Sequence, residues 1–221
     1  MELKLNYSFD RNVENAYIIT MPNHPISIEY TKRCQQSCEA IEMPYVLWEA
    51  FDGSDNKTIK IPQHALHESF YQILKNFNDK MSISQIALLL SHISLWLHCC
   101  KIDKPIVILE HDAIMLRKFE QVHSYNAIVY LGCKEWVKHN WPMFPIPPFG
   151  AHEPNYRFIL RAHAYAIDPQ VAKNLLAHVV QFGLHQTADF IIRSDIFNIT
   201  HQGLYAYDES GITTINNPLD K

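Results

Sequence analysis

Pro105-Ile106-Val107-Ile108-Leu109-Glu110-His111-Asp112-Ala113 is the stretch that decides the fold of this chain. Its four consecutive apolar residues, 106–109, are rich in β-branched side chains and predict a buried strand. The strand ends in two acids, Glu110 and Asp112, with one residue between them. In an open α/β sheet, ligands bind at the carboxyl ends of the strands, so the acids stand where a site would form.

The Glu-x-Asp pair has two interpretations. Carboxylates at a strand end can hold a hard divalent cation such as Mg²⁺ or Mn²⁺, and that cation can in turn hold a diphosphate. The same three residues also suit an ordinary acidic turn between a strand and a loop, and short motifs often arise by chance. Taken alone, the residues leave both interpretations open.

The segment before this strand, residues 82–97, predicts a helix that is apolar almost all round and therefore buried. Ser82 and Gln85 have the spacing of a capping box, in which the Gln85 side chain reaches back to the amide of the cap residue. Ser91 and His92 lie in the middle of the helix. Polar side chains on a buried helix need partners, and a bound phosphate or the turn after Glu110 could supply them. A lone histidine on a buried helix is also commonly a core residue whose hydrogen bonds are satisfied within the protein.

The remaining segments indicate an α/β protein that forms one domain over residues 1–221, starting with the strand-helix-strand order of a doubly wound sheet. Besides residues 106–109, strands are expected over 15–20, 45–50, 126–132 and 158–167. Besides residues 82–97, helices are expected over 25–40, 64–77 and 169–182. We expect strand 126–132 to lie beside strand 106–109. Residues 136–157 are rich in proline and aromatic side chains, which suits a binding lid or a rigid surface loop.

Composition excludes several classes of function. The 221 residues are 48% hydrophobic and 19% charged, which is ordinary for a globular protein with a sizeable core. A net charge of -4 and the absence of a Lys/Arg cluster argue against nucleic-acid binding and an anionic-membrane patch. Residues 1–6 lack the apolar core of a signal peptide, and the apolar run 86–97 is too short and too polar to span a bilayer. The expectation is a soluble cytoplasmic protein without an integral membrane segment, able to meet an acceptor at the inner membrane.

Cysteine and histidine usage adds no metal centre. The five cysteines are an odd number in a chain without a signal peptide, which favours reduced, packed thiols. Cys34 and Cys38 lie four residues apart on a predicted helix, but no second pair has zinc spacing. The thirteen histidines are scattered and form no metal motif.

The helix with Ser91-His92, followed by a strand ending Leu109-Glu110-His111-Asp112, resembles glycosyltransferase family 25, the lipooligosaccharide galactosyltransferase-like proteins. Weaker matches extend the resemblance over residues 14–217: Glu49-Ala50-Phe51-Asp52-Gly53, Ala164-Tyr165-Ala166-Ile167 with helix 169–180, and Thr187-Ala188-Asp189. The resemblance implies a GT-A-like fold, in which a Rossmann-type nucleotide-sugar-binding sheet is flanked by helices. It also implies transfer of a hexose, with galactose as the candidate, from a UDP-sugar to a hydroxyl of a glycan acceptor, with inversion and with Mn²⁺ or Mg²⁺.

The resemblance also implies roles for individual residues. Glu110 and Asp112 would hold the metal ion, and His201, expected on the loop after the last apolar run, could add a ligand. Asp189, or as second candidate His92, would take the proton of the acceptor. Donor binding is expected at Pro22, Asp52, Gly53, Ser91, His92, Glu110, His111 and Asp112. Acceptor binding is expected at Trp141, Phe149 and Tyr156, since aromatic rings stack on sugar faces.

Three residues depart from the family pattern and keep two rival functions open. Gln85 replaces a glutamate, His111 replaces the middle acid of the Leu-Glu-Asp-Asp pattern, and Arg161 stands where the family usually has a glycine. A degenerate family member would bind a nucleotide or glycan without turnover. Alternatively, two acids at a strand end also suit a metal-dependent phosphohydrolase.

Overall fold

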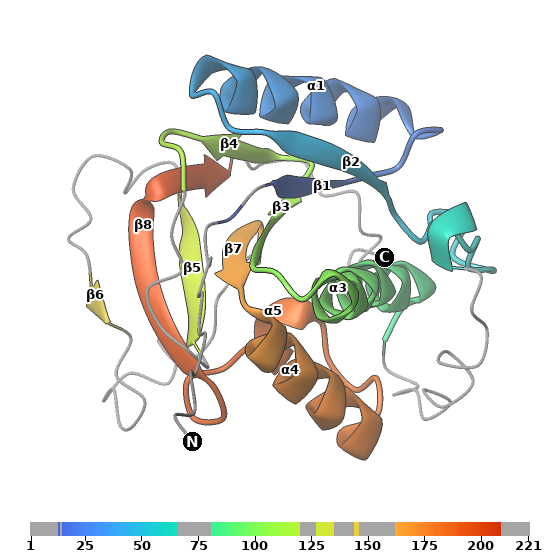
Figure 1. Ribbon diagram of the computed structural model, residues 1–221. Coiled ribbons are helices and arrows are strands. Elements are labelled where there is room, and N and C mark those ends of the chain that lie inside the picture. The colour runs from blue at the N-terminus through green and yellow to red at the C-terminus, as the bar shows by residue number, and fades with distance from the viewer. Residues whose placement is uncertain are drawn as a thin grey trace, which may run out of the picture.

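The strand predicted at residues 106–109 is β3, Ile106–Glu110, and it lies inside a mixed sheet that helices flank on both faces (Figure 1). The computed structural model describes residues 13, 15–65, 81–119, 127–134, 144–145 and 162–208. The other strands are β1 Ala16–Thr20, β2 Tyr45–Glu49, β4 Ala113–Met115, β5 Ala127–Lys134, β6 Phe144–Pro145, β7 Ala164–Ile167 and β8 Asn198–Asp208. The helices are α1 Pro25–Ala40, the 3₁₀ helix η1 Gln63–Ala65, α3 Ile83–Ile102, α4 Pro169–Phe182 and α5 Ala188–Ile191.

The strand order β2-β1-β3-β7-β5-β8-β4 combines two parallel groups. β1 pairs in parallel with β2 and β3, as the strand-helix-strand order predicts, and β5 pairs in parallel with β8. β7 runs antiparallel between β3 and β5 and joins the two groups. The prediction that residues 126–132 lie beside 106–109 is therefore wrong. Order along the chain does not fix order in a sheet, and here a later strand inserts between them.

Alternating side chains along β1 and β3 face two separate cores. Tyr17 and Ile108 belong to the core under α3, α4 and α5, whereas Ile18 and Leu109 belong to the core under α1. The helices lie on the two faces of the sheet in Figure 1. Both faces are apolar because the strands are buried on both sides. By the same alternation, the side chain of Glu110 belongs to the face of α3.

The ends of the sheet differ from the sequence-based expectations. β8 is one strand of 11 residues, where the sequence shows two short apolar runs, 196–201 and 204–207. β4 was not predicted, because three residues are too few to show a period. In place of the start of the helix expected over 64–77, the structure has η1, and residues 66–77 lie outside the described part of the chain. Residues 158–161 of the strand expected over 158–167 also lie outside it.

The caps of α3 and α4 are those that the sequence predicts. Ser82 accepts a hydrogen bond from the amide of Gln85 at 3.2 Å, and the Gln85 side chain accepts one from the amide of Ser82 at 2.9 Å. Gln85 therefore does the capping work that a glutamate would do. Asp168 caps α4 through the amide of Val171 at 2.8 Å, and Gly183 ends it with φ of 78°.

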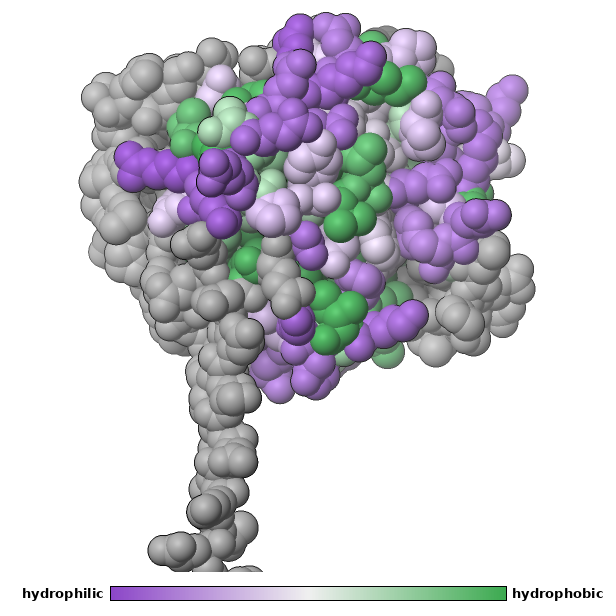
Figure 2. Space-filling view, turned by 45° about the horizontal axis from the view of Figure 1, so that its top comes forward, coloured by the Kyte–Doolittle hydropathy of each residue, from purple (hydrophilic) through white to green (hydrophobic). Residues whose placement is uncertain are grey.

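α3 is the one helix in the described part of the chain that is long and apolar enough to cross a membrane. However, 67% of its apolar window is buried within the fold, which is the environment of a core helix. On the surface seen in Figure 2, hydrophobic residues are scattered among hydrophilic ones. Isolated exposed apolar residues of this kind are normal for a globular surface.

Two histidine rings contact Trp48 on β2, the strand at one edge of the sheet. The Trp48 ring lies 4.1 Å from the ring of His64 and 4.8 Å from that of His98, between ring centroids. Burial lowers the pKa of both histidines, and for His98 nearby positive charge on Lys101 adds to the effect. The folded protein therefore resists protonating this cluster.

We expect the free energy of unfolding to fall between pH 7.5 and pH 5.5. A histidine whose pKa is lower in the folded state contributes stability that is fully present above its unfolded pKa of about 6.5 and is lost as pH falls toward its folded pKa. Urea unfolding at both pH values measures the fall. His98→Gln keeps a hydrogen-bonding group near Tyr17 but cannot titrate, so its fall should be smaller; an equal fall would contradict the assignment.

Candidate functional site

The carboxyl ends of β1, β2 and β3 meet at one edge of the sheet. Thr20 is in register with Glu49, and Ile19 is in register with Glu110. The segments that follow, residues 21–24, 50–53 and 111–112, therefore leave the sheet side by side. This edge brings together the predicted donor-binding residues from all three strands.

Glu110 is the acid of this edge that points inward. Its Oε1 lies 3.2 Å from Nε2 of His92 on α3, and its amide donates to the carbonyl of His163 at 2.8 Å. Burial by itself would raise the pKa of Glu110, but the hydrogen bond to His92 and the proximity of His163 and His111 outweigh it, so the pKa is lowered. The carboxylate thus stays ionised while 21% of its side chain remains exposed.

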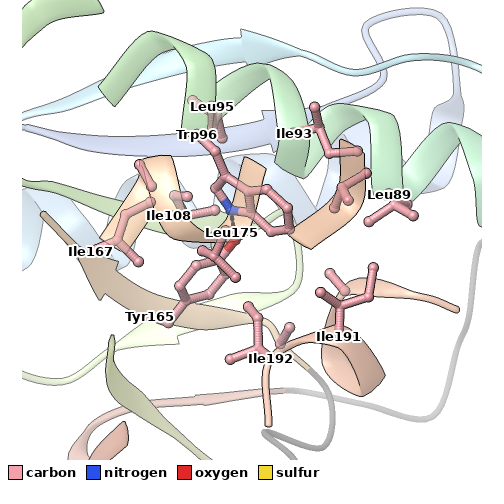
Figure 3. Packing of buried hydrophobic residues seen from close by; sticks show 14 of the residues in the cluster. Leu89, Ile93, Leu95, Trp96, Ile108, Tyr165, Ile167, Leu175, Ile191 and Ile192 are labelled. Atoms are coloured by element: carbon pink, nitrogen blue, oxygen red, sulfur yellow. Dashed lines mark hydrogen bonds between the residues drawn. The ribbon is translucent and has the colours of Figure 1, made fainter. Parts of the chain in front are cut away.

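His92 is completely buried, and both of its ring nitrogens have partners. Besides the contact with Glu110, Nδ1 lies 2.9 Å from the hydroxyl of Tyr165 on β7. The same hydroxyl accepts a hydrogen bond from the indole N–H of Trp96 at 2.9 Å, drawn as a dashed line in Figure 3. His92 therefore lies in a polar network inside the apolar core of α3, α4 and β7.

Asp112 and His111 lie on the side of α1. Cys34, on α1, has its pKa raised by its hydrogen bond to Cys38, by burial and, to a smaller extent, by the charge of Asp112. The ring of His111 meets that of Tyr30 edge-on, 6.2 Å between centroids. Burial lowers the pKa of His111. The two acids of the Glu-x-Asp pair thus have different surroundings, Glu110 against α3 and Asp112 near α1.

No three His, Cys, Asp or Glu side chains among the described residues lie close enough together to hold a metal ion. A magnesium-like site does not require such a group, because Mg²⁺ is commonly bound by one or two carboxylates together with substrate phosphates and water. The carboxylate oxygens of Glu110 and Asp112 are hard ligands, the type that such an ion takes.

The loop between β1 and α1 holds Pro22 at the surface of the same edge. The amide of Met21 donates to the hydroxyl of Ser27 at 2.9 Å, and the amide of His24 donates to the carbonyl of Met21 at 3.1 Å. These bonds fix the loop against the first turn of α1. Pro25 then starts the helix, as the sequence predicts.

The second loop of this edge follows β2 and contains Asp52 and Gly53, and Ser91 of α3 contacts it. Asp52 accepts from the amide of Ser54 at 2.9 Å and pairs with Lys60 at 3.1 Å. Burial alone would raise its pKa, but these hydrogen bonds lower it. The Ser91 hydroxyl accepts from the amide of Phe51 at 2.9 Å and donates to a carbonyl of α3. Ser91 therefore ties this loop to α3.

Gly53 packs directly on the first turn of α3. A Cβ atom at this position would lie 2.7 Å from the carbonyl oxygen of Ile83 and 3.0 Å from Cβ of Ala87. We expect Gly53→Ala to lower the free energy of unfolding by about 1–3 kcal/mol, because the loop must move away from the helix. Urea unfolding measures the loss. Lys57→Ala, at an exposed position of the same loop, is the control, and equal stability of the two variants would contradict this packing role.

Asp189 lies in the first turn of α5, where the hydroxyl of Thr187 donates to its Oδ1. The side chain is half-buried, and its neighbours Ala188 and Ile191 belong to the core of the α3 face. Asp189 therefore lies at the border of the apolar core on the α3 face. Its predicted role as general base stays a prediction.

The prediction that His201 lies on a loop is wrong, because residues 198–208 form the continuous strand β8, held by pairing with β5 and β4. β8 stands three strands from β3 in the sheet order, which is about 14 Å at the usual strand spacing. β4 brings the other end of β8 to the site, with Asp208 in register with Ala113. Asp208 is an almost fully buried acid beside the Glu-x-Asp turn.

The sequence-based prediction missed three residues of this region: Tyr165, His163 and Asp208. Tyr165 was recognised as part of a strand but not as a partner of His92. His163 packs its ring against Gly132, where a Cβ atom would lie 2.3 Å from Nε2. Only the pairing of β3 with β7 and of β4 with β8 brings these residues to the site, and no local pattern in the sequence shows those pairings. The predicted acceptor residues Trp141, Phe149 and Tyr156 lie outside the described residues.

Comparison with known proteins identifies the family of the chain. No curated protein matches the sequence. A family model described as glycosyltransferase family 25 (LPS biosynthesis protein) matches residues 15–144, which include α1, α3 and the Glu-x-Asp turn after β3. Because this match covers more than half of the 221 residues, the chain belongs to glycosyltransferase family 25.

Proposed function

We propose that this chain transfers a hexose, with galactose as the candidate, from a UDP-sugar to a hydroxyl of a glycan acceptor, with inversion at the sugar carbon. The observation that carries the proposal is Glu110. In a member of a glycosyltransferase family, it is an ionised carboxylate held at the edge where β1, β2 and β3 end. The three parallel strands and the antiparallel β7 agree with a GT-A-like sheet.

In this proposal the residues of the edge divide the work of binding the donor. Glu110 and Asp112 would hold Mn²⁺ or Mg²⁺, which when bound neutralises charge on the departing diphosphate. The loops that contain Pro22 and Asp52 would flank the uridine. Gly53 and Ser91 keep the second loop against α3, so they act by shaping the site.

The proton of the acceptor needs a base within hydrogen-bond reach. His92 is completely buried with both ring nitrogens bonded, so it offers no face to an acceptor. Of the two predicted bases, the proposal therefore keeps Asp189. The acceptor would bind against the aromatic side chains of Trp141, Phe149 and Tyr156, and the reaction would take place in the cytoplasm.

Calorimetry of UDP and UDP-hexoses with and without Mn²⁺ tests the donor site. We expect binding that depends on the metal and weakens about 10-fold or more in Asp112→Asn. Asp103→Asn makes the same chemical change at an exposed position before the opposite end of β3 and should bind as the unaltered protein does. Absence of UDP binding, or equal binding by both variants, would overturn the proposed donor site, and hydrolysis of general phosphoesters would favour a phosphohydrolase.

A further inference from the structure

Four side chains form an unbroken hydrogen-bonded row from the core to the site: Trp96, Tyr165, His92 and Glu110. The first three are fully buried, and only Glu110 reaches the exposed edge. Figure 3 shows the start of the row, where Trp96 from α3 and Tyr165 from β7 point toward one another among aliphatic side chains. A polar row of this kind in an apolar core is costly unless every donor and acceptor is used.

The chemistry of the donor groups determines which side chain donates and which accepts at each hydrogen bond of this row. The indole N–H of Trp96 can only donate, so the hydroxyl oxygen of Tyr165 accepts from it. The tyrosine then has one proton left, and among the described residues the one acceptor within reach is Nδ1 of His92. Burial raises the pKa of Tyr165 well above its ordinary value, so the hydroxyl keeps that proton.

With Nδ1 of His92 accepting, its Nε2 must carry the ring proton and donate to Oε1 of Glu110. The opposite tautomer would set a lone pair against the carboxylate and leave the tyrosine proton without an acceptor among the described residues. Both consequences are unfavourable inside a core, where an unpaired polar group loses its hydration without compensation. Every bond in the row therefore points from the core toward Glu110.

We propose that Tyr165 is a positioning residue of the transferase: it fixes the tautomer of His92, and His92 in turn orients Glu110 with Oε2 directed to the donor edge. The second carboxylate oxygen has no hydrogen bond to any described residue, so it is the one available to a ligand. This inference rests on the proposed function for its purpose, but the tautomer can be tested without it. Tyr165 and Trp96 are both fully buried, so they act on Glu110 only through His92.

The ¹⁵N chemical shifts of the His92 ring, measured by NMR on the unaltered protein at pH 7.5, test the row directly. The expected result is a neutral ring with the proton on Nε2. A proton on Nδ1, or on both nitrogens, would overturn the inference whether or not the protein transfers sugar. His98 is an internal comparison, because its ring also bonds a tyrosine hydroxyl, that of Tyr17 through Nε2, but no carboxylate of the described residues bonds it.

Two variants of His92 separate positioning from simple packing. In His92→Gln the amide can occupy the place of Nε2 and still donate to Glu110, whereas in His92→Asn it reaches only the place of Nδ1. Binding of Mn²⁺ alone, measured by calorimetry, should weaken about 10- to 100-fold in His92→Asn and recover most of this loss in His92→Gln. Equal Mn²⁺ affinities of the two variants, both folded by circular dichroism, would overturn the inference.

Tyr165→Phe removes only the hydroxyl and should weaken Mn²⁺ binding about 10-fold, with a detectable Nδ1-protonated form of His92. Tyr17→Phe removes a hydroxyl bonded to His98 on the same helix and should bind Mn²⁺ as the unaltered protein does. If the unaltered protein binds no Mn²⁺ either alone or together with UDP, the metal of the proposed function is wrong, and the ¹⁵N shifts of His92 still decide the inference.

Discussion

Replacing Glu110 with glutamine is expected to slow sugar transfer by about 100-fold or more. The change removes an ionised group of the edge whose oxygen is held in place by a buried side chain, that of His92. A bound divalent ion contributes several kcal/mol to stabilising the departing diphosphate, and about 3 kcal/mol corresponds to about 100-fold in rate. The amide also conflicts with His92 if its nitrogen faces Nε2, so the side chain must turn its oxygen inward.

Release of UDP from a UDP-hexose in the presence of an acceptor glycan measures this effect. Glu29→Gln is the matched control, because Glu29 is an exposed residue of α1 that pairs with Arg33 on the surface. Urea unfolding of both variants separates lost chemistry from lost fold. A Glu110→Gln protein that transfers sugar at an undiminished rate would remove Glu110 from the site.

The central part of the fold could be predicted because its signals are local. The run 106–109 predicts β3, the capping pair Ser82 and Gln85 predicts the start of α3, and Asp168 with Pro169 predicts the start of α4. Each of these signals depends on a few neighbouring side chains and the backbone groups next to them. The parallel pairing of β1 with β2 and β3 follows from the crossover helices between them.

The second half of the sheet could not be predicted in the same way. The positions of β4 and β7 depend on contacts with β8 and β3, which are far away in the sequence. His201 illustrates the consequence, because two short apolar runs with a glycine between them gave no sign of one long strand. Asp208 was overlooked for the same reason, since only its register with Ala113 brings it to the site.

The sequence predicted which edge of the sheet carries the candidate site, but it did not predict which side chains contact Glu110 and His92. Glu110, Asp112, Asp52 and Pro22 do lie along the carboxyl ends of adjacent strands, as the strand-end rule requires. The sequence could not show that Glu110 faces α3 while Asp112 lies near α1. It also gave no reason to join His92 to Tyr165, because that contact spans 73 residues of chain. Their roles in catalysis stay predictions.

Trp96→Ala is expected to lower the free energy of unfolding by about 3–5 kcal/mol, the usual loss for a large aromatic side chain in a core. Trp96 is the largest of the fully buried side chains of the described residues, and Figure 3 shows it enclosed between α3, β7 and the segment at Ile191. A domain is commonly stable by only about 5–15 kcal/mol, so this single change removes a large part of the total. Equilibrium unfolding in urea measures the loss.

Two further variants separate the packing of Trp96 from its hydrogen bond. Trp96→Phe keeps most of the ring but leaves the hydroxyl of Tyr165 without its buried donor, which should cost about 1–3 kcal/mol. Val180→Ala, at a position that is 48% exposed on α4, should change stability by less than about 0.5 kcal/mol. A loss below about 1 kcal/mol for Trp96→Ala would mean that α3 and β7 do not pack as described. Trp96 also holds Tyr165 in place beside His92. The stability of the core and the proposed orientation of Glu110 therefore both depend on Trp96.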